Sequence, residues 1–80
     1  MCAILGFSTS SPQGSNINAI NTGIYNLRHR GPDNTGLWIS EDECLGMAHS
    51  RLSIIDLSSK ANQPMANDTR DLIIGFNGEI

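Results

Sequence analysis

The sequence is poor in positive charge. Its 80 residues contain five Lys and Arg against eight Asp and Glu, giving a formal net charge of −3, and the basic residues form no cluster. Nucleic acids and anionic membranes both select basic surfaces. Neither a nucleic acid nor a membrane is therefore expected as a partner, and a small or neutral substrate fits the composition better.

Long apolar runs are also missing. No stretch approaches the roughly 20 apolar residues that a membrane-spanning helix needs, and no basic segment precedes a short apolar one, as it would in a signal peptide. The expected location is therefore cytoplasmic. In that reducing compartment Cys2 and Cys44, the only two cysteines of the sequence, would remain thiols rather than pair.

Metal-binding spacing is absent as well. The Cys and His residues are Cys2, His29, Cys44 and His49, and they form neither a C-x-x-C nor an H-x-x-x-H pattern. Structural and catalytic metal sites usually show such spacing. We expect no metal site.

The chain begins with a residue that carries two reactive groups. If Met1 is removed, Cys2 becomes the N-terminus, and its α-amine, with a pKa of about 7.7 to 8.0, can accept the proton of its own thiol. The apolar run 3–7 predicts a buried strand that would hold this terminus in place. Most cysteines at position 2 have no such role, so Cys2 alone does not decide the function.

One amphipathic helix is expected. Ser15 is a candidate N-cap, and the apolar residues recur at steps of three and four: Ile17, Ile20, Ile24 and Leu27. Positive charge in the last turn, at 28–30, suits the helix dipole, and Gly31 before Pro32 predicts the end of the helix. This local explanation accounts for His29 and Arg30 without a catalytic role.

The rest of the chain has the pattern of strands. Segments 37–40 and 44–49, joined by an acidic tip, predict a hairpin. A further extended run covers 51–57, a loop containing Pro64 follows, and a turn at 68–70 precedes a last apolar strand at 72–76. One helix and about five strands in hairpin-like order predict an α+β fold with a largely antiparallel sheet. The chain ends on this strand pattern without a closing helix, so we interpret it as part of a larger domain.

Two clusters carry groups suited to substrate binding. Arg51 offers a guanidinium, which grips a carboxylate through two parallel hydrogen bonds. In Asn77-Gly78-Glu79, a side-chain amide and a glycine N–H can point at one oxygen, and Glu79 can receive an ammonium group. Taken singly, a surface Arg and an Asn-Gly hairpin turn are the more frequent explanations.

Taken together, five blocks in order along the whole chain resemble the class II glutamine amidotransferases. The blocks are MCAILGF at 1–7, HRGPD at 29–33, AHSRLSIIDLS at 48–58, QPM at 63–65 and FNGEI at 76–80. Other members of the class typically have a Thr-Arg-Trp type of block where this chain has residues 50–54, which favours the glutaminase domain of the asparagine synthetases. Ala3 and Ala61 stand where that branch commonly has Gly, and neither change removes a reactive group.

The resemblance implies an N-terminal-nucleophile hydrolase fold, a four-layer αββα sandwich of antiparallel sheets, of which residues 1–80 would be the N-terminal, truncated portion. It implies L-glutamine as substrate and an ammonia-accepting synthetase domain in cis that makes asparagine from aspartate. No cofactor is implied for this segment; ATP and magnesium would belong to the synthetase domain. The resemblance is also compatible with a homodimer of the full-length protein.

The resemblance also implies residue roles. Cys2 would attack the glutamine amide and form a thioester, while Asn77 and the Gly78 N–H would form the oxyanion hole. Arg51 would hold the α-carboxylate of the substrate and Glu79 its α-ammonium group. The implied substrate-binding set is Arg51, Leu52, Ser53, Ile54, Ile55, Asn77, Gly78 and Glu79.

Two alternatives remain open. An amidotransferase with another ammonia acceptor, in an amino-sugar or cell-surface sugar pathway, would keep the same glutaminase. A binding fragment without catalytic activity would not need the free amine of Cys2.

Overall fold

The computed structural model describes residues 2–12, 14–53 and 59–77. Its elements in chain order are β1 (Ala3–Ser8), α1 (Gly14–Asn26), the 3₁₀ turn η1 (Arg28–Arg30), β2 (Asn34–Ile39), β3 (Leu45–Arg51), the 3₁₀ turn η2 (Ser59–Ala61), β4 (Met65–Ala66) and β5 (Ile73–Ile74). Both sheets are antiparallel, so the predicted α+β class is confirmed. No helix among these residues is long and apolar enough to cross a membrane.

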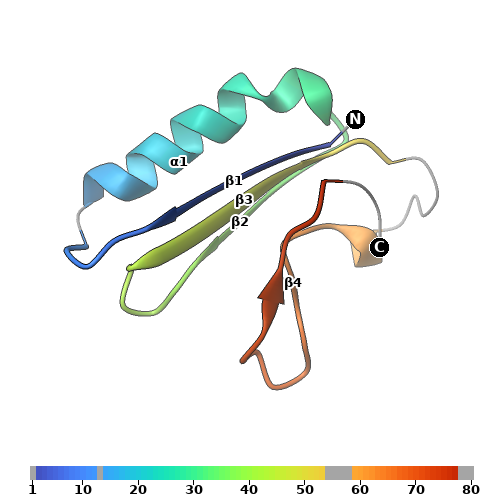
Figure 1. The fold of residues 1–80 in the computed structure, drawn as a ribbon. Coiled ribbons are helices and arrows are strands. Elements are labelled where there is room, and N and C mark those ends of the chain that lie inside the picture. The colour runs from blue at the N-terminus through green and yellow to red at the C-terminus, as the bar shows by residue number, and fades with distance from the viewer. Residues whose placement is uncertain (1, 13, 54–58, 78–80) are drawn as a thin grey trace.

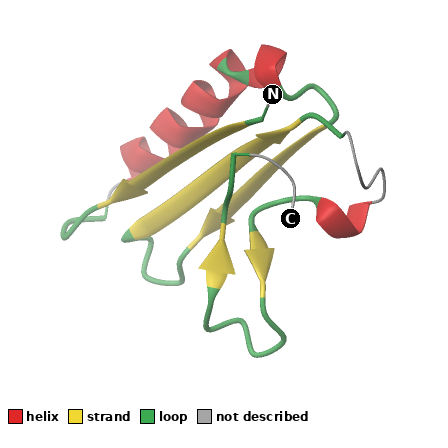
Figure 2. Ribbon diagram, turned by 45° about the vertical axis from the view of Figure 1, so that its right-hand side comes forward, coloured by secondary structure: helices red, strands yellow, loops and turns green. Residues whose placement is uncertain are grey.

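The elements form three layers. Strands β1, β3 and β2 make a sheet in that order, with β3 in the centre. Helix α1 covers one face of this sheet, and the short hairpin β4–β5 lies against the other (Figures 1 and 2). The expected strand at the N-terminus and the hairpin with its acidic tip are therefore confirmed. The expected burial of that strand is wrong in part, because buried or half-buried residues alternate with exposed ones along β1 and Ile4 is 50% exposed.

The two faces of β3 carry side chains of different size. Gly46, Ala48 and Ser50 alternate with larger residues along the strand, and Ala48 forms the core with Ile20 and Ile24 of α1. The predicted apolar stripe of the helix is thus confirmed at its centre. Small residues on this face let the helix approach the sheet closely.

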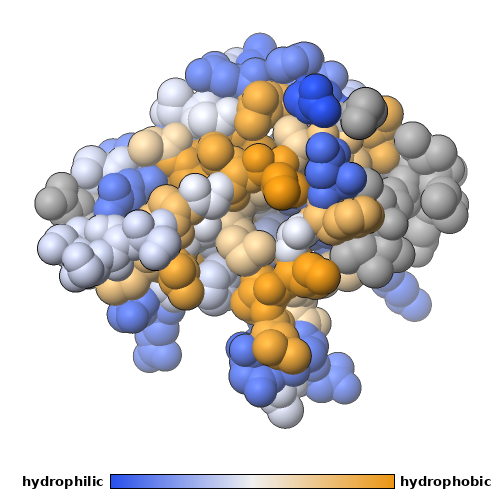
Figure 3. All heavy atoms as spheres, viewed as in Figure 1, coloured by the Kyte–Doolittle hydropathy of each residue, from blue (hydrophilic) through white to orange (hydrophobic). Residues whose placement is uncertain are grey.

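The second face of the sheet receives the β4–β5 hairpin. A Cβ on Gly36 of β2 would lie 1.8 Å from the carbonyl oxygen of Gln63, and a Cβ on Gly75 would lie 3.2 Å from Cε of Met47. The backbone of the segment around Gln63 therefore lies directly on β2. The hairpin and the residue after it carry exposed apolar side chains at Leu72, Ile74 and Phe76, and Figure 3 shows apolar surface in this region.

The ends of the helix differ from the prediction. Ser15 is the second residue of α1, so its assignment as the N-cap is wrong. The α-helix ends at Asn26, and residues 28–30 form a separate turn in which the N–H groups of Arg30 and Gly31 bond to the carbonyls three residues earlier. Gly31 has φ −153°, which is extended backbone, so it is not a left-handed cap. Its lack of a Cβ matters because that atom would lie 2.3 Å from the Ser50 backbone.

The second half of the chain also differs in part. Arg51 was expected to open a strand, but it is the last residue of β3. Leu52 and Ser53 follow without regular structure, and the rest of the predicted run, 54–57, lies outside the described residues. The expected loop after it contains η2 and β4, and the last strand is limited to Ile73–Ile74. The turn at 68–70 is confirmed by the hydrogen bond from Arg70 N–H to Asn67 O at 3.0 Å.

Candidate active site

Cys2 lies at the start of β1 and is 3% exposed. The Leu52 N–H donates to its sulfur at 3.4 Å, and the thiol lies 3.9 Å from the Leu52 carbonyl oxygen. The carbonyl of Cys2 accepts a hydrogen bond from Nε of Arg30 at 3.2 Å. Two separate segments therefore hold the residue, which is what a positioned N-terminal nucleophile requires, whereas most chain termini fray.

The hydrogen bond from Arg30 to Cys2 was not predicted from the sequence. Its position in a basic turn gave a sufficient local reason for the charge, and nothing in the pattern pointed 28 residues back to Cys2. The guanidinium links η1 to the first residues of the chain. His29 beside it lies on the surface, where it lines a shallow pocket with Arg28, Pro32 and Thr35.

Arg51 is buried, with 1% of its surface exposed. Its Nη1 donates to Oδ1 of Asn62 at 2.8 Å, and its carbonyl accepts the Asp33 N–H at 2.9 Å. The guanidinium therefore has a fixed orientation before any substrate binds. Asn62 was not predicted, because an isolated polar residue in a loop gives no periodic signal.

Asp33 fixes the segment that follows Arg51. Its Oδ2 accepts the backbone N–H of Ser53 at 2.6 Å, in addition to the backbone bond with Arg51. Asp33 thus holds both ends of the segment from Arg51 to Ser53. Between them, the Leu52 N–H bonds to the Cys2 sulfur. Of the predicted substrate-binding residues, Leu52 therefore contacts Cys2, and Arg51 and Ser53 are its neighbours in the chain.

Asn77 follows Phe76, whose backbone N–H and carbonyl are both hydrogen-bonded to buried side chains. The Phe76 N–H donates to Oε1 of Gln63 at 2.6 Å, and Nε2 of His49 lies 2.9 Å from the Phe76 carbonyl oxygen. His49 and Gln63 are 0% and 2% exposed. Asn77 itself is exposed, so its side chain is accessible to a ligand.

The electrostatics of the site fix the state of His49. Burial lowers the pKa of its imidazole; the hydrogen bond to the Phe76 carbonyl opposes this and the nearby charge of Arg51 adds to it. The ring is therefore neutral at pH 7 and donates through Nε2–H to Phe76 O. In the described part of the chain, Nδ1 has no hydrogen-bond partner.

Ile54, Ile55, Gly78 and Glu79 lie outside the described residues. Within the described ranges, no group of three or more His, Cys, Asp or Glu side chains could share a metal ion. Cys44 lies by the hairpin tip, where burial and then the Asp42 carboxylate raise the pKa of its thiol.

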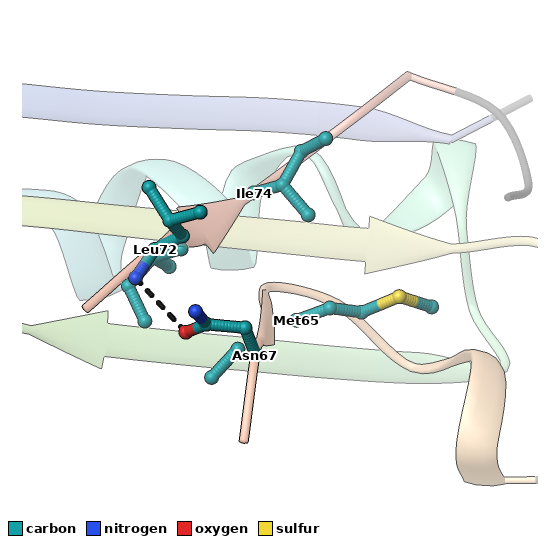
Figure 4. A pocket seen from close by; sticks show the side chains of 6 residues that line it. Met65, Asn67, Leu72 and Ile74 are labelled. Carbon is teal, nitrogen blue, oxygen red and sulfur yellow. Dashed lines mark hydrogen bonds between the residues drawn. The ribbon is translucent and has the colours of Figure 1, made fainter. Parts of the chain in front are cut away.

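A further pocket lies within the β4–β5 hairpin. Its lining residues are Met65, Ala66, Asn67, Leu72, Ile73 and Ile74. In Figure 4 the Asn67 side chain accepts the Leu72 N–H, at 3.0 Å, across the hairpin. None of the candidate site residues that the structure describes, Cys2, Arg51, Leu52, Ser53 and Asn77, lines this pocket.

Comparison with known proteins identifies the family of this chain. The family model described as a glutamine amidotransferase domain matches residues 1–80. An amidase, chry2, from Gibberella zeae is 39% identical over 64 residues, covering 80% of this chain and 10% of its own. A putative asparagine synthetase (glutamine-hydrolyzing) from Methanocaldococcus jannaschii is 36% identical over 98 aligned positions, covering 100% of this chain and 18% of its own.

Asparagine synthetase B (glutamine-hydrolyzing) from Escherichia coli is 44% identical over 54 residues, covering 68% of this chain and 9% of its own. The chain thus spans less than a fifth of the length of these relatives. No solved structure gives a significant match. The predicted similarity to asparagine synthetases is confirmed, and the match along its whole length shows that the chain belongs to the glutamine amidotransferase domain family.

Proposed function

We propose that residues 1–80 form the N-terminal portion of a glutaminase domain, in which Cys2 releases ammonia from glutamine. The observation that carries this proposal is the contact of the Cys2 sulfur with Leu52, the residue directly after the buried Arg51. This contact brings Cys2 and Arg51, for which we propose the roles of nucleophile and carboxylate-binding group, to one end of the sheet. The three described layers would be part of a four-layer αββα sandwich.

The chemistry starts with the terminus. After removal of Met1, the α-amine of Cys2 takes the thiol proton, and the sulfur attacks the side-chain carbonyl carbon of glutamine. The negative charge that develops on the carbonyl oxygen is stabilised by the side-chain amide of Asn77 and the N–H of Gly78. As the tetrahedral adduct collapses, the protonated amine returns its proton to the departing nitrogen, and ammonia leaves.

The product of this step is a thioester between Cys2 and the glutamyl group. Water, deprotonated by the α-amine, attacks the thioester carbonyl, and glutamate is released with the thiol restored. During both steps Arg51 binds the α-carboxylate, Glu79 binds the α-ammonium group, and the backbone of residues 52–55 lines the pocket. These groups bind the part of the substrate that does not react.

The acceptor of the ammonia is the next element of the proposal. Relatives named glutamine-hydrolyzing asparagine synthetases favour an ATP-dependent synthetase domain in the same protein that makes asparagine from aspartate. ATP and magnesium would be bound there rather than by residues 1–80. The similarity to a protein named an amidase favours a second candidate, the same glutaminase chemistry supplying a different acceptor.

The test uses the full-length protein. Cys2→Ala should abolish glutamate release from glutamine, because the thiol that attacks the amide is lost, while synthesis with added ammonia continues. Cys44→Ala is the matched control, since it removes the other thiol, near the β2–β3 hairpin tip, and should retain both activities. Glutamine hydrolysis by the Cys2→Ala variant would refute the proposal.

A trapping experiment separates catalysis from simple binding. A chloroketone or diazoketone analogue of glutamine should alkylate Cys2 and no other residue, and excess glutamine should protect it. A binding module would leave Cys2 unmodified. Peptide mapping by mass spectrometry reads out the result.

A further inference from the structure

Among the described residues, His49 and Gln63 are the largest fully buried side chains that have no role in the proposed chemistry. Both side chains are almost completely buried. Burying an amide or an imidazole is unfavourable unless its hydrogen bonds are replaced. Both side chains direct such a bond to the same residue, Phe76, although they come from different parts of the chain.

The two bonds fix two consecutive peptide planes. The Phe76 N–H belongs to the peptide unit between Gly75 and Phe76, and Gln63 holds that unit. The Phe76 carbonyl belongs to the planar unit that also contains the Asn77 nitrogen, and His49 holds this second unit. Once both planes are fixed, only the torsions of Asn77 itself decide where its side-chain amide points.

The ladder of β5 does not supply this constraint. Among the described residues, its pairing with β4 ends at Ile74, two residues before Phe76. Side chains therefore replace the strand bonds at Phe76, directly before Asn77. Gln63 is itself held, because its carbonyl lies against β2 where Gly36 has no side chain.

We propose that His49 and Gln63 are positioning residues for the oxyanion donor: by holding the backbone on both sides of Phe76 they direct the Asn77 side-chain amide toward the reacting oxygen. This inference rests on the proposed glutaminase function. An oxyanion donor acts only within hydrogen-bond distance of the developing charge, and a displacement of about 1 Å can lower the rate about 100-fold. Neither side chain touches the substrate.

The neutral state of His49 fits this role. A neutral imidazole carries one N–H, and here Nε2–H points at the Phe76 carbonyl. Burial and the charge of Arg51 both disfavour a second proton on the ring. Donation to a backbone carbonyl, rather than proton transfer to substrate, is what this environment favours.

The test measures glutamine hydrolysis by the full-length protein carrying His49→Leu or Gln63→Met, which remove the bonding groups at similar volume. We expect kcat to fall about 10- to 100-fold with KM changed less than about threefold, since the donor acts in the transition state. His49→Gln retains an N–H near the Nε2 position and should recover part of the loss. His29→Leu, the same change at an exposed His, is the control and should have no effect.

A second set of variants separates positioning from general structural support. In an Asn77→Ala background the group to be positioned is gone, so adding His49→Leu should lower kcat by less than about threefold. The rate of Cys2 alkylation by iodoacetamide, which needs no oxyanion hole, should stay at the wild-type value. Ammonia-dependent synthesis should also be unchanged.

Three results would overturn the inference: an unchanged kcat in both single variants, an equal loss with and without Asn77, or a change confined to KM. If His49→Leu fails to fold, Gln63→Met and His49→Gln still give the same comparison with Asn77→Ala. Failure of the proposed function has a different signature, because Cys2→Ala would then retain hydrolysis. The inference alone fails when Cys2→Ala is inactive and the His49 and Gln63 variants keep the wild-type kcat.

Discussion

Replacing Arg51 by Lys tests the carboxylate clamp most directly. The guanidinium is buried at the end of the central strand, and one of its terminal nitrogens is already engaged by Asn62 at 2.8 Å. That bond orients the planar group, so the other donors face a fixed direction. Lysine keeps the positive charge but presents a point charge on a flexible stem, without the paired geometry.

The size of the effect follows from the bonds that are lost. A hydrogen bond to a charged group contributes about 1.5 to 3 kcal/mol, and a weakly placed one closer to 1 kcal/mol. Because about 1.4 kcal/mol corresponds to a factor of ten, we expect KM for glutamine to rise roughly 5- to 150-fold. The α-carboxylate is remote from the scissile amide and is bound equally in the ground and transition states, so kcat should change much less.

The assay is glutamate release by the full-length protein as a function of glutamine concentration. KM equals the dissociation constant only when chemistry is slow, so calorimetric binding of glutamine to the Cys2→Ala protein, with and without Arg51→Lys, should give the same ratio. Arg28→Lys is a matched control on an exposed arginine that stacks on Tyr25. It should leave KM unchanged.

Asn62→Ala extends the argument to the residue that orients the clamp. It leaves the charge of Arg51 in place and removes only the bond to Nη1. KM should rise in the same direction as for Arg51→Lys, by a smaller factor, and the two changes together should be less than additive. An unchanged KM in Arg51→Lys, or a fall in kcat at constant KM, would show that Arg51 is not the carboxylate clamp.

Two further predictions concern the oxyanion donor and the packing of the turn before β2. Asn77→Ala should lower kcat about 100- to 1,000-fold with little change in KM, as loss of an oxyanion donor does elsewhere; steady-state kinetics in which only KM moves would make Asn77 a ground-state binder. Gly31→Ala should destabilise the protein by about 1 to 3 kcal/mol, because the added Cβ would meet the Ser50 backbone at 2.3 Å. Gly14→Ala, where a Cβ meets nothing within 4 Å, is the control, and equal melting temperatures for the two variants would contradict the packing argument.

Local patterns predicted the elements whose signals are local. The apolar run of β1, the helical spacing of Ile20 and Ile24, and the acidic tip between β2 and β3 each lie within one element, and all three were confirmed. The end of the helix was not predictable in the same way. It depends on the close approach of Gly31 to Ser50, 19 residues later, whose hydroxyl donates to the Gly31 carbonyl at 2.7 Å.

The central strand explains why part of the site was missed. An antiparallel sheet commonly has one solvated face, and polar residues at alternate positions of β3 therefore indicate exposure. Here α1 packs on one face and residues between Gln63 and Phe76 lie against part of the other, and His49 and Arg51 are buried polar residues rather than surface ones. Their partners Phe76 and Asn62 lie 27 and 11 residues away, beyond the reach of any periodic pattern.

The candidate site residues come from two layers of the structure, the β1–β3–β2 sheet and the β4–β5 hairpin, and each group is held by different contacts. Cys2, Arg51 and Leu52 gather at one end of the β1–β3–β2 sheet, and they depend on strand pairing and on the turn that contains Asp33. Asn77 comes from the hairpin layer and depends on His49 and Gln63. A change in how the hairpin packs on the sheet would therefore move Asn77, the proposed oxyanion donor, while leaving Cys2 and Arg51, the proposed nucleophile and carboxylate clamp, in place. Substitutions of Asn77, His49 and Gln63 should therefore change kcat, whereas substitutions of Arg51 and Asn62 should change KM.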